Sequence, residues 1–403
     1  MYAITGVGIV DQLGTELDKN FERMIKGDVS YDIDWDTVNE YLIEKELFKK
    51  RDIIRNFVSP DALLGVYATS KALEDSGVKH VPTVPVITAS LHGGGVAQDR
   101  IFEKYHERAM NNPELDYHDM STKPIRWSPN QLLSTGIEFT ASYVAMSFGY
   151  IGPIFNVAST CSSTIQAIEI ASLWLERGEP YVIVTSSDAL AKNKPSVNFF
   201  TGIGAASKEG VCKPFDENRS GMVLGDAAVT FILEKEEVAR KRKAKIYGII
   251  KGYGNANDAS SPASPSPEGI GCEYAYEQAF KMAGISYDDI DFINAHGTAT
   301  LIGDPVEIDV MKKYFDRTEV PIVSHKGNVG HCMGACGAVE IAYGLETLRK
   351  KVIPPTGGLE KPIDDHFLFG NHNFSIEFPE VKTFVKNSFG FGGRASAIII
   401  NKV

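Results

Sequence analysis

Three segments of the chain place a reactive side chain where an apolar strand ends in a turn of small residues. The first is Asn156-Val-Ala-Ser-Thr-Cys-Ser-Ser-Thr, which contains Cys161. A cysteine at the start of a helix faces unpaired backbone N–H groups and the positive end of the helix dipole, and both lower the pKa of a thiol. Cys161 is therefore a candidate nucleophile. A buried cysteine that only packs fits this local pattern equally well.

The second segment is Asn294-Ala-His-Gly-Thr-Ala-Thr, which contains His296. It follows an apolar strand expected at 291–295, and open α/β sheets hold their ligands at the carboxyl ends of their strands. Thr298 and Thr300 place hydroxyl groups beside the histidine. Further on, Asp304-Pro305 has the pattern of a helix N-cap followed by proline, so Asp304 also fits a purely structural role.

The third segment is the Gly-rich loop 324–337, which contains His331 and again joins a strand to a helix. Lys326 lies five residues before His331 and is expected to be partly enclosed. A buried lysine is costly unless it is paired or functional, and Glu340 on the following helix is its candidate partner.

A zinc site is the alternative for this loop, with His325, His331, Cys332 and Cys336 as ligands. The sequence has no CxxC pair, and structural zinc prefers closely and regularly spaced ligands. We therefore expect no metal here, and we expect Cys332 and Cys336 to pack as small residues in a Gly/Ala-rich helix.

A last motif, Asn387-Ser-Phe-Gly-Phe-Gly-Gly-Arg-Ala, precedes the final strand. Its glycines allow backbone N–H groups to approach a ligand, and its two phenylalanines could close an apolar tunnel. A nucleotide loop is the alternative. The motif lacks both the dinucleotide-binding spacing and the lysine of a phosphate-binding loop, so the nucleotide interpretation is disfavoured.

The elements that must position these residues alternate between strand and helix. Apolar runs predict strands over 84–90, 181–186, 246–250, 291–295, 320–324 and 395–400, and helical spacing predicts helices over 62–76, 165–177, 272–283, 305–314 and 335–350. Such alternation is typical of an α/β fold with a largely parallel sheet.

The chain also repeats itself. Ala72-Leu-Glu-Asp-Ser-Gly-Val resembles Ala279-Phe-Lys-Met-Ala-Gly-Ile, and Glu169-Ile-Ala resembles Glu340-Ile-Ala, in the same order. The pattern favours a duplicated α/β unit with its seam near 234–245. The first copy is longer, and the polar, irregular stretch around 96–130 fits as its insertion.

Composition sets limits on function. The chain has 403 residues and a formal net charge of −11, and 43% of the residues are hydrophobic. This composition is typical of a folded soluble protein, and the acidic balance argues against a nucleic-acid binder. No secretory signal opens the sequence, and five cysteines are few and odd in number, so we expect a cytoplasmic protein.

One segment, 139–168, has no charged residue and is long enough to suggest a membrane span. Its glycines, proline and Ser/Thr cluster are instead typical of a buried helix, a Gly-Pro turn, a short strand and a second helix. We therefore expect no membrane span.

Taken together, the motifs resemble those of a family. The opening Thr5-Gly-Val-Gly-Ile-Val, the Cys161 segment, Lys213-Pro-Phe-Asp with Arg219-Ser-Gly, His296-Gly-Thr-Ala-Thr, the Lys326 to His331 segment and Gly390-Phe-Gly-Gly occur in the order found in β-ketoacyl-acyl carrier protein synthases. The resemblance covers nearly the whole chain and is strongest to ketosynthase II and polyketide ketosynthases.

This resemblance implies a fold. The family has the thiolase fold, in which two βαβαβαββ halves with five-stranded sheets form an α-β-α-β-α layered arrangement. We expect the halves at 1–240, with the nucleophile and the insertion, and at 241–403, with the catalytic histidines.

The resemblance also implies roles. The catalytic set would be Cys161 as acyl-accepting nucleophile, His296 and His331 as donors to the extender's thioester carbonyl, and Lys326 in support. The backbone N–H groups of Cys161 and Phe391 would form the oxyanion hole, with Phe391 as a gate. The remaining candidates are the substrate-binding residues Thr298, Thr300, Phe200, His92, Gly390 and Gly392, and the supporting residues Asp304 and Glu340. No cofactor is implied, because the substrates travel on the phosphopantetheine of an acyl carrier protein.

Some positions depart from the family pattern. The usual Gly-Ala-Ala-Gly after the second histidine is Gly334-Ala-Cys-Gly, so that Cys336 replaces an alanine. His92 stands where an aliphatic residue is more usual. If His92 lines the pocket, a shorter, polar or unsaturated acyl group becomes plausible.

The implied partner is an acyl carrier protein. Carrier proteins are acidic, and the cluster Lys49, Lys50, Arg51 and Arg55 is a candidate docking patch, although a run of charge is more often a solvated face. The family predicts a homodimer, or a heterodimer with a second ketosynthase-like chain, with 139–168 as a candidate interface. A non-elongating chain-length-factor partner is the alternative function, which Cys161 disfavours, and a thiolase or a coenzyme-A-dependent acyltransferase is a third.

Overall fold

The computed structural model describes residues 1–54, 58–92, 94–111, 129, 134–261, 265–315, 320–370 and 375–403. The strands are β1 Tyr2–Val10, β2 Val86–Ala89, β3 Ile154–Val157, β4 Val182–Ala189, β5 Asp226–Lys235, β6 Gly248–Asn257, β7 Phe292–Asn294, β8 Pro321–Val323, β9 Val352–Ile353, β10 Leu368–Phe369, β11 Ile376–Glu377, β12 Thr383–Gly390 and β13 Arg394–Asn401.

The α-helices are α1 Leu17–Ile25, α2 Trp35–Glu44, α3 Lys50–Ile54, α4 Pro60–Ser76, α5 Gly95–Asn111, α8 Phe139–Phe148, α9 Ser163–Glu176, α10 Lys194–Gly202, α11 Glu236–Lys241, α12 Ile270–Ala283, α13 Gly303–Tyr314, α14 Lys326–Val329 and α15 Cys336–Lys350. Three short 3₁₀ turns are η1 Thr160–Ser162, η2 Tyr287–Asp289 and η3 Met333–Ala335.

The order of the strands shows the duplication directly. One half runs β1-β5-β4-β2-β3 and the other runs β6-β13-β12-β7-β8 with β10 added at its edge. Equivalent strand pairs in the two halves also have the same relative direction. The pairs β1–β5 and β6–β13 are both antiparallel, and the pairs β2–β4 and β7–β12 are both parallel. The predicted duplicated α/β fold is therefore correct.

The two halves share one sheet, which was not expected. Three antiparallel pairs, Tyr2 with Ile250, Ala3 with Ile249 and Ile4 with Gly248, join β1 to β6 and make an 11-stranded sheet. The five strands expected for each half are present, and the two five-stranded sheets are joined through these edge strands. The physical reason is that β1 and β6 are each the edge of their half, and pairing satisfies backbone groups that would otherwise be exposed.

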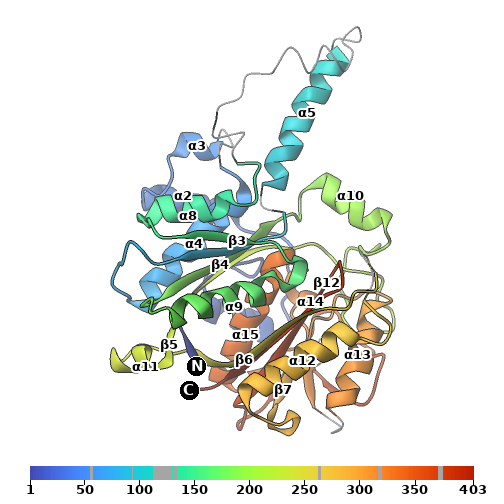
Figure 1. Cartoon of the computed structure of the whole chain (residues 1–403). Coiled ribbons are helices and arrows are strands. Elements are labelled where there is room, and N and C mark those ends of the chain that lie inside the picture. The colour runs from blue at the N-terminus through green and yellow to red at the C-terminus, as the bar shows by residue number, and fades with distance from the viewer. Residues whose placement is uncertain are drawn as a thin grey trace.

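Helices lie on both faces of each half and give the expected five layers (Figure 1). In one half α4 packs on β1, β4 and β5, and in the other α12 packs on β6 and β13. Between the halves, α9 contacts β2, β3 and β4, α15 contacts β5 and β12, and the two helices contact each other. Every residue of α15 from Cys336 to Leu348 is buried, as a helix enclosed on all sides requires.

The repeated motifs mark equivalent helix ends. Ser59 caps α4 by accepting the backbone N–H of Ala62, and Pro60 follows it. Gly77 ends α4 and Gly284 ends α12, both in the left-handed conformation that glycine adopts without strain. The two Glu-Ile-Ala motifs also lie in equivalent helices, α9 and α15. Counted from the first residue of each helix, the motif begins two residues earlier in α15 than in α9.

The insertion of the first half is more regular than expected. Residues 95–111 form α5, which projects from the body of the molecule (Figure 1). The prediction of an irregular stretch is wrong here, because the segment is rich in helix formers such as Ala, Glu, Arg and Lys. Residues 112–128 and 130 lie outside the described part of the chain.

The uncharged segment 139–168 has the predicted elements. It forms α8, a turn at Gly149–Pro153, β3, η1 and the start of α9. Over the described residues, no helix combines the length and apolar character needed to cross a bilayer.

Candidate active site

A cavity of about 540 Å³ lies where the two halves meet. Its wall is mainly apolar and draws on both halves of the chain. Of the predicted residues, it is lined by Cys161, Phe200, His296, Thr298, Thr300, His331, Gly390 and Phe391. The structure therefore brings together side chains that are more than a hundred residues apart in the sequence.

Cys161 is presented by an unusual backbone turn between β3 and α9. Thr160, just before it, has φ of 51°, a left-handed conformation that a β-branched residue rarely adopts. Gly390 makes this turn possible, because a Cβ atom at that position would lie 1.9 Å from Oγ1 of Thr160. Cys161 is only 8% exposed, so its thiol faces the cavity and little of it faces bulk solvent.

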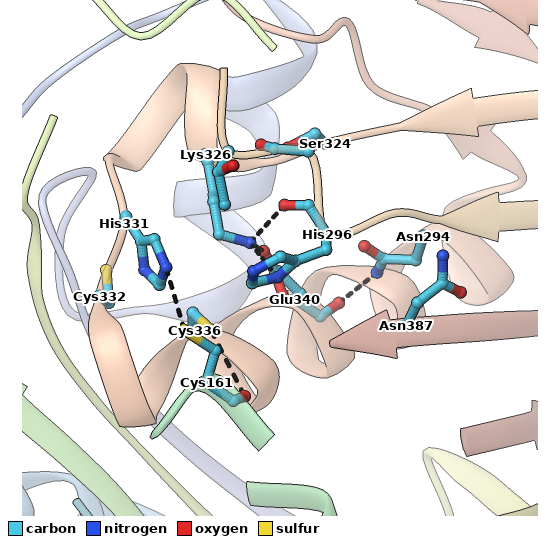
Figure 2. Close-up of polar contacts among 12 residues, drawn as sticks. Cys161, Asn294, His296, Ser324, Lys326, His331, Cys332, Cys336, Glu340 and Asn387 are labelled. Carbon is cyan, nitrogen blue, oxygen red and sulfur yellow. Dashed lines mark hydrogen bonds and ion pairs between the residues drawn. The ribbon is translucent and has the colours of Figure 1, made fainter. Parts of the chain in front are cut away.

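His331 contacts the Cys161 thiol. Its Nε2 lies 3.2 Å from Sγ of Cys161, and its Nδ1 accepts the backbone N–H of Met333 at 3.0 Å (Figure 2). Because Nδ1 is an acceptor, a neutral imidazole carries its proton on Nε2 and donates it toward the sulfur. The backbone of His331 is held in turn by Val223 and Gly225.

His296 has the same tautomer for a different reason. Lys326 Nζ donates to Nδ1 of His296 at 3.2 Å and to its carbonyl oxygen at 2.5 Å. Burial, reinforced by the charge of Lys326, lowers the pKa of His296 to about 3, so the ring is neutral with its proton on Nε2. The two histidine rings are perpendicular, with centroids 5.5 Å apart.

Lys326 belongs to a buried charge network. It forms the predicted ion pair with Glu340, and Lys386 on β12 lies 2.9 Å from the second carboxylate oxygen of Glu340. Burial alone would raise the pKa of Glu340, but the two ammonium groups lower it to about 2. Two lysines against one carboxylate leave an excess positive charge, which a Cys161 thiolate would balance.

Glu307 and Lys386 were missed by the sequence analysis. The Glu307 carboxylate accepts the backbone N–H groups of His296 at 2.6 Å and Gly297 at 2.7 Å, and Asn387 donates to it as well. It therefore fixes the loop that carries His296. A charged residue inside the apolar run of β12 was the available signal for Lys386.

Asp304 holds the same loop but is not the helix cap that was predicted. The cap of α13 is Ile302, and Asp304 lies in the first turn of the helix. Its carboxylate accepts the N–H of Thr298 at 3.0 Å and that of Phe215 at 2.7 Å, across two loops. Burial raises its pKa to about 7.

Two predicted binding residues do not line the cavity. Leu91 lines it where His92 was expected, because the backbone N–H groups of both residues are held by Asp188 and the side chain of His92 is placed elsewhere. His92 therefore gives no support to a polar acyl group, because that expectation required its side chain in the cavity wall. Gly392 also lies outside the lining, whereas its neighbours Phe391 and Gly393 belong to it.

Aromatic and hydroxyl groups gather near the cavity mouth. The rings of Phe391 and Phe200 stack with centroids 6.2 Å apart, and Phe391 is 38% exposed whereas Phe200 is buried. The hydroxyls of Thr298 and Thr300 lie 3.0 Å apart. A Cβ atom added at Gly390 would lie 3.2 Å from the backbone nitrogen of Cys161, so Gly390 lies beside the peptide of the nucleophile.

Cys336 stands closer to the nucleophile than expected. Its thiol donates to the carbonyl oxygen of Cys161 at 3.8 Å, and its sulfur lies within 4.8 Å of the Cys161 sulfur. This neighbouring thiol, together with His331 and His296, places the pKa of the Cys161 thiol well below its usual value. The available signal in the sequence was that Cys336 stands where the family pattern has an alanine.

The four ligands of the zinc alternative do not form one group. Within the described chain, the donor atoms of Cys161, His331 and Cys336 lie within 4.8 Å of one another, as do those of His296, Cys336 and Glu340. His325 instead packs against the ring of Tyr343.

The candidate docking cluster is away from the cavity lining. Lys49, Lys50 and Arg51 are exposed at the start of α3, and Arg55 lies outside the described residues. Their role stays a prediction.

Comparison with known proteins gives concordant matches. Residues 6–239 match the model of the "Beta-ketoacyl synthase, N-terminal domain" and residues 247–360 that of the "Beta-ketoacyl synthase, C-terminal domain". The 3-oxoacyl-(acyl-carrier-protein) synthase 2 of Coxiella burnetii is 26% identical, over 99% of this chain and 98% of its own.

Two further matches agree. A putative mitochondrial 3-oxoacyl-(acyl-carrier-protein) synthase of Schizosaccharomyces pombe is 31% identical over 68% of this chain and 67% of its own. The crystal structure of a β-ketoacyl synthase from Burkholderia phymatum has the same fold, with a TM-score of 0.84, 24% identity and coverage of 100% of this chain and 99% of its own. The two domain models together span the nucleophile and both histidines, and the chain belongs to the β-ketoacyl synthase family.

Proposed function

We propose that this protein is a β-ketoacyl-acyl carrier protein synthase, which condenses a Cys161-bound acyl group with a malonyl group on an acyl carrier protein and releases carbon dioxide. The observation that carries the proposal is the position of the Cys161 thiol. It lies 3.2 Å from Nε2 of His331, in a cavity that His296 also lines. One nucleophile and two N–H donors are what this two-step reaction needs.

The first step is acyl transfer. The Cys161 thiolate attacks the thioester carbonyl of an acyl carrier, the bond from the carbonyl carbon to the carrier's sulfur breaks, and that sulfur leaves as a thiolate. Negative charge develops on the carbonyl oxygen, and we assign the backbone N–H groups of Cys161 and Phe391 to receive it. The low pKa of Cys161 keeps the nucleophile ionised without a general base.

The second step is decarboxylative condensation. The thioester carbonyl of the malonyl group accepts hydrogen bonds from Nε2 of His296 and of His331. As the carboxylate leaves as carbon dioxide, its electron pair forms an enolate on that carbonyl. The enolate carbon attacks the Cys161 thioester, the carbon–sulfur bond breaks, and the Cys161 thiolate is restored.

The tautomers support donor roles for the histidines. His296 cannot act as a base through Nδ1, because Lys326 already donates to that atom. Its pKa of about 3 also means that it is neutral, and not a cation, throughout the physiological range. A neutral donor stabilises the enolate without quenching it by proton transfer.

The proposed partner of this chain is inferred from the names of its matched relatives. The matched relatives are named for an acyl carrier protein, and we extend this partner to the present chain, with Lys49, Lys50, Arg51 and Arg55 as the docking patch. A pair of ketosynthase-type chains, identical or not, is the proposed assembly, with 139–168 at the interface. The nucleophile needs a reduced thiol, which favours a reducing compartment such as the cytoplasm.

The test is covalent loading followed by product formation. Incubation with an acyl carrier should add one acyl group to Cys161 by intact-protein mass spectrometry, and malonyl carrier should then yield a β-ketoacyl carrier. Cys161→Ala should lose both signals, whereas Cys212→Ala, at a buried thiol outside the cavity lining, should keep them. Acyl transfer to the Cys161→Ala variant would contradict the proposal.

A further measurement separates the related functions. A non-elongating chain-length-factor partner would accept no acyl group alone and would co-purify with a second ketosynthase-like chain. A thiolase or coenzyme-A-dependent acyltransferase would turn over malonyl-coenzyme A faster than the malonyl carrier. We expect preference for the carrier-linked substrate.

A further inference from the structure

A second thiol lies directly beside the nucleophile. Cys336 is the first residue of α15, and Cys161 belongs to the turn η1 that contacts this helix. Their sulfur atoms and a ring nitrogen of His331 lie within 4.8 Å of one another, and Figure 2 shows the two cysteines adjacent below the histidine. The proposed condensation does not use Cys336.

The two thiols differ in ionisation. The nearby Cys336 thiol and the two histidines lower the pKa of Cys161 well below its usual value. Burial and the neighbouring Cys161 raise the pKa of Cys336 well above its usual value. The pair therefore combines a thiolate, which attacks oxidants, with a protonated thiol that is held next to it.

Only one of the two thiols can be reached from the cavity. Cys161 lines the cavity, whereas Cys336 is 2% exposed and does not line it. Burial raises the pKa of the other three cysteines, Cys212, Cys272 and Cys332, so that they remain thiols. A small oxidant that enters the cavity should react first at Cys161.

We propose that Cys161 and Cys336 form a reversible disulfide when hydrogen peroxide oxidises the protein, and that this bond protects the nucleophile from irreversible oxidation. The Cys161 thiolate attacks one peroxide oxygen, the oxygen–oxygen bond breaks, and with one proton the products are Cys161 sulfenic acid and water. The Cys336 sulfur then attacks the sulfenic sulfur and displaces hydroxide, which takes the Cys336 proton and leaves as a second water. Two thiols are oxidised and one peroxide is reduced.

Small movements are sufficient for this bond. A disulfide brings two sulfurs to about 2 Å, and these sulfurs start within 4.8 Å. The pairing uses only the two thiols and peroxide, so it goes beyond the proposed condensation and can be tested without carrier protein.

The experiment is peroxide treatment of the full-length protein, followed by intact and peptide mass spectrometry. We expect the wild-type protein to lose the mass of two hydrogen atoms and to yield a peptide pair linked through Cys161 and Cys336. Dithiothreitol should return both thiols. Cys336→Ala should instead gain two oxygen atoms at Cys161, as a sulfinic acid that dithiothreitol does not reduce.

Two variants control the result. Cys272→Ala removes another thiol that lines the cavity, and it should leave the disulfide intact. Cys336→Ser keeps the size of the side chain and should behave as Cys336→Ala, which separates loss of the thiol from a packing defect. Stable sulfenic or sulfinic acid at Cys161 in the wild type, or a two-hydrogen loss that survives in Cys336→Ala, would overturn the proposal.

Discussion

Lys326 contacts His296 twice, through the ring nitrogen Nδ1 at 3.2 Å and through the backbone carbonyl at 2.5 Å. The first contact fixes the tautomer and the second fixes the position of the residue. Glu340 in turn holds Lys326 in place. One buried lysine thus determines both the direction and the protonation of a donor that we assign to the decarboxylation step.

Removal of this lysine should affect the two steps unequally. We expect Lys326→Ala to slow decarboxylation of the malonyl carrier roughly a hundred- to a thousand-fold, because His296 can then turn or take the other tautomer. Acyl loading of Cys161 should change much less, since we assign it to the Cys161 thiolate and to backbone N–H groups. Single-turnover loading and carbon dioxide release, measured separately, test this split.

The control for this variant is Lys361→Ala, since that ammonium is 68% exposed and pairs with surface Glu217. It should alter neither step. An equal loss in both steps for Lys326→Ala, with unchanged thermal unfolding, would contradict the assignment of the lysine to His296.

Glu340→Gln should destabilise the fold strongly. Glu340 separates the ammonium groups of Lys326 and Lys386, both fully buried, and its loss leaves two like charges together in the core. Breaking a buried pair by removing one partner typically costs about 3–5 kcal/mol in the free energy of unfolding. Urea unfolding monitored by circular dichroism measures it.

The matched variant is Glu346→Gln on the same helix. The Glu346 side chain is only 2% exposed, but its partner Arg349 is 46% exposed and keeps its ion pair with Asp18, so the change should cost no more than about 1 kcal/mol. If both variants unfold at the same urea concentration, the buried network does not stabilise the protein as inferred.

The sequence was sufficient for the parts of the site that lie within single motifs. Cys161, His296 and His331 each follow a strand, and strand ends are readable from a short window. The Lys326–Glu340 pair could be predicted because both residues belong to one loop and the helix after it. The alternation of elements was likewise enough for the α/β fold, and the repeated motifs were enough for its duplication.

Other contacts depend on how distant elements meet. Lys386 reaches Glu340 only because β12 lies beside α15, and Cys336 reaches Cys161 only because α15 packs against η1. The same reason explains why β1 pairs with β6 and why Leu91, and not His92, lines the cavity. All of these contacts join elements that are far apart in the sequence. Local periodicity does not determine how such elements pack against each other.

The ionisation of Cys161 gives a pH-dependent prediction. Only the thiolate reacts with iodoacetamide, so a lowered pKa moves the midpoint of the alkylation rate to lower pH than that of a free thiol. Cys336→Ala removes the neighbouring thiol that contributes most to the lowered pKa of Cys161, and the midpoint should therefore move to higher pH. Cys272→Ala should leave it in place, and a midpoint that is the same in all three proteins would contradict the role of Cys336.

Gly390→Ala tests the backbone turn that presents the nucleophile. The new Cβ would lie 1.9 Å from Oγ1 of Thr160, so η1 or β12 must shift, and we expect acyl loading of Cys161 to be lost with a stability cost of about 1–3 kcal/mol. Gly202→Ala, where no atom lies within 4 Å, is the matched control and should load normally. The double variant Thr160→Ala/Gly390→Ala should recover part of the loading, because the next contacts are at 3.0 Å and beyond. If loading stays absent in the double variant while its thermal unfolding matches the wild type, the Thr160 hydroxyl is not what excludes a side chain at residue 390.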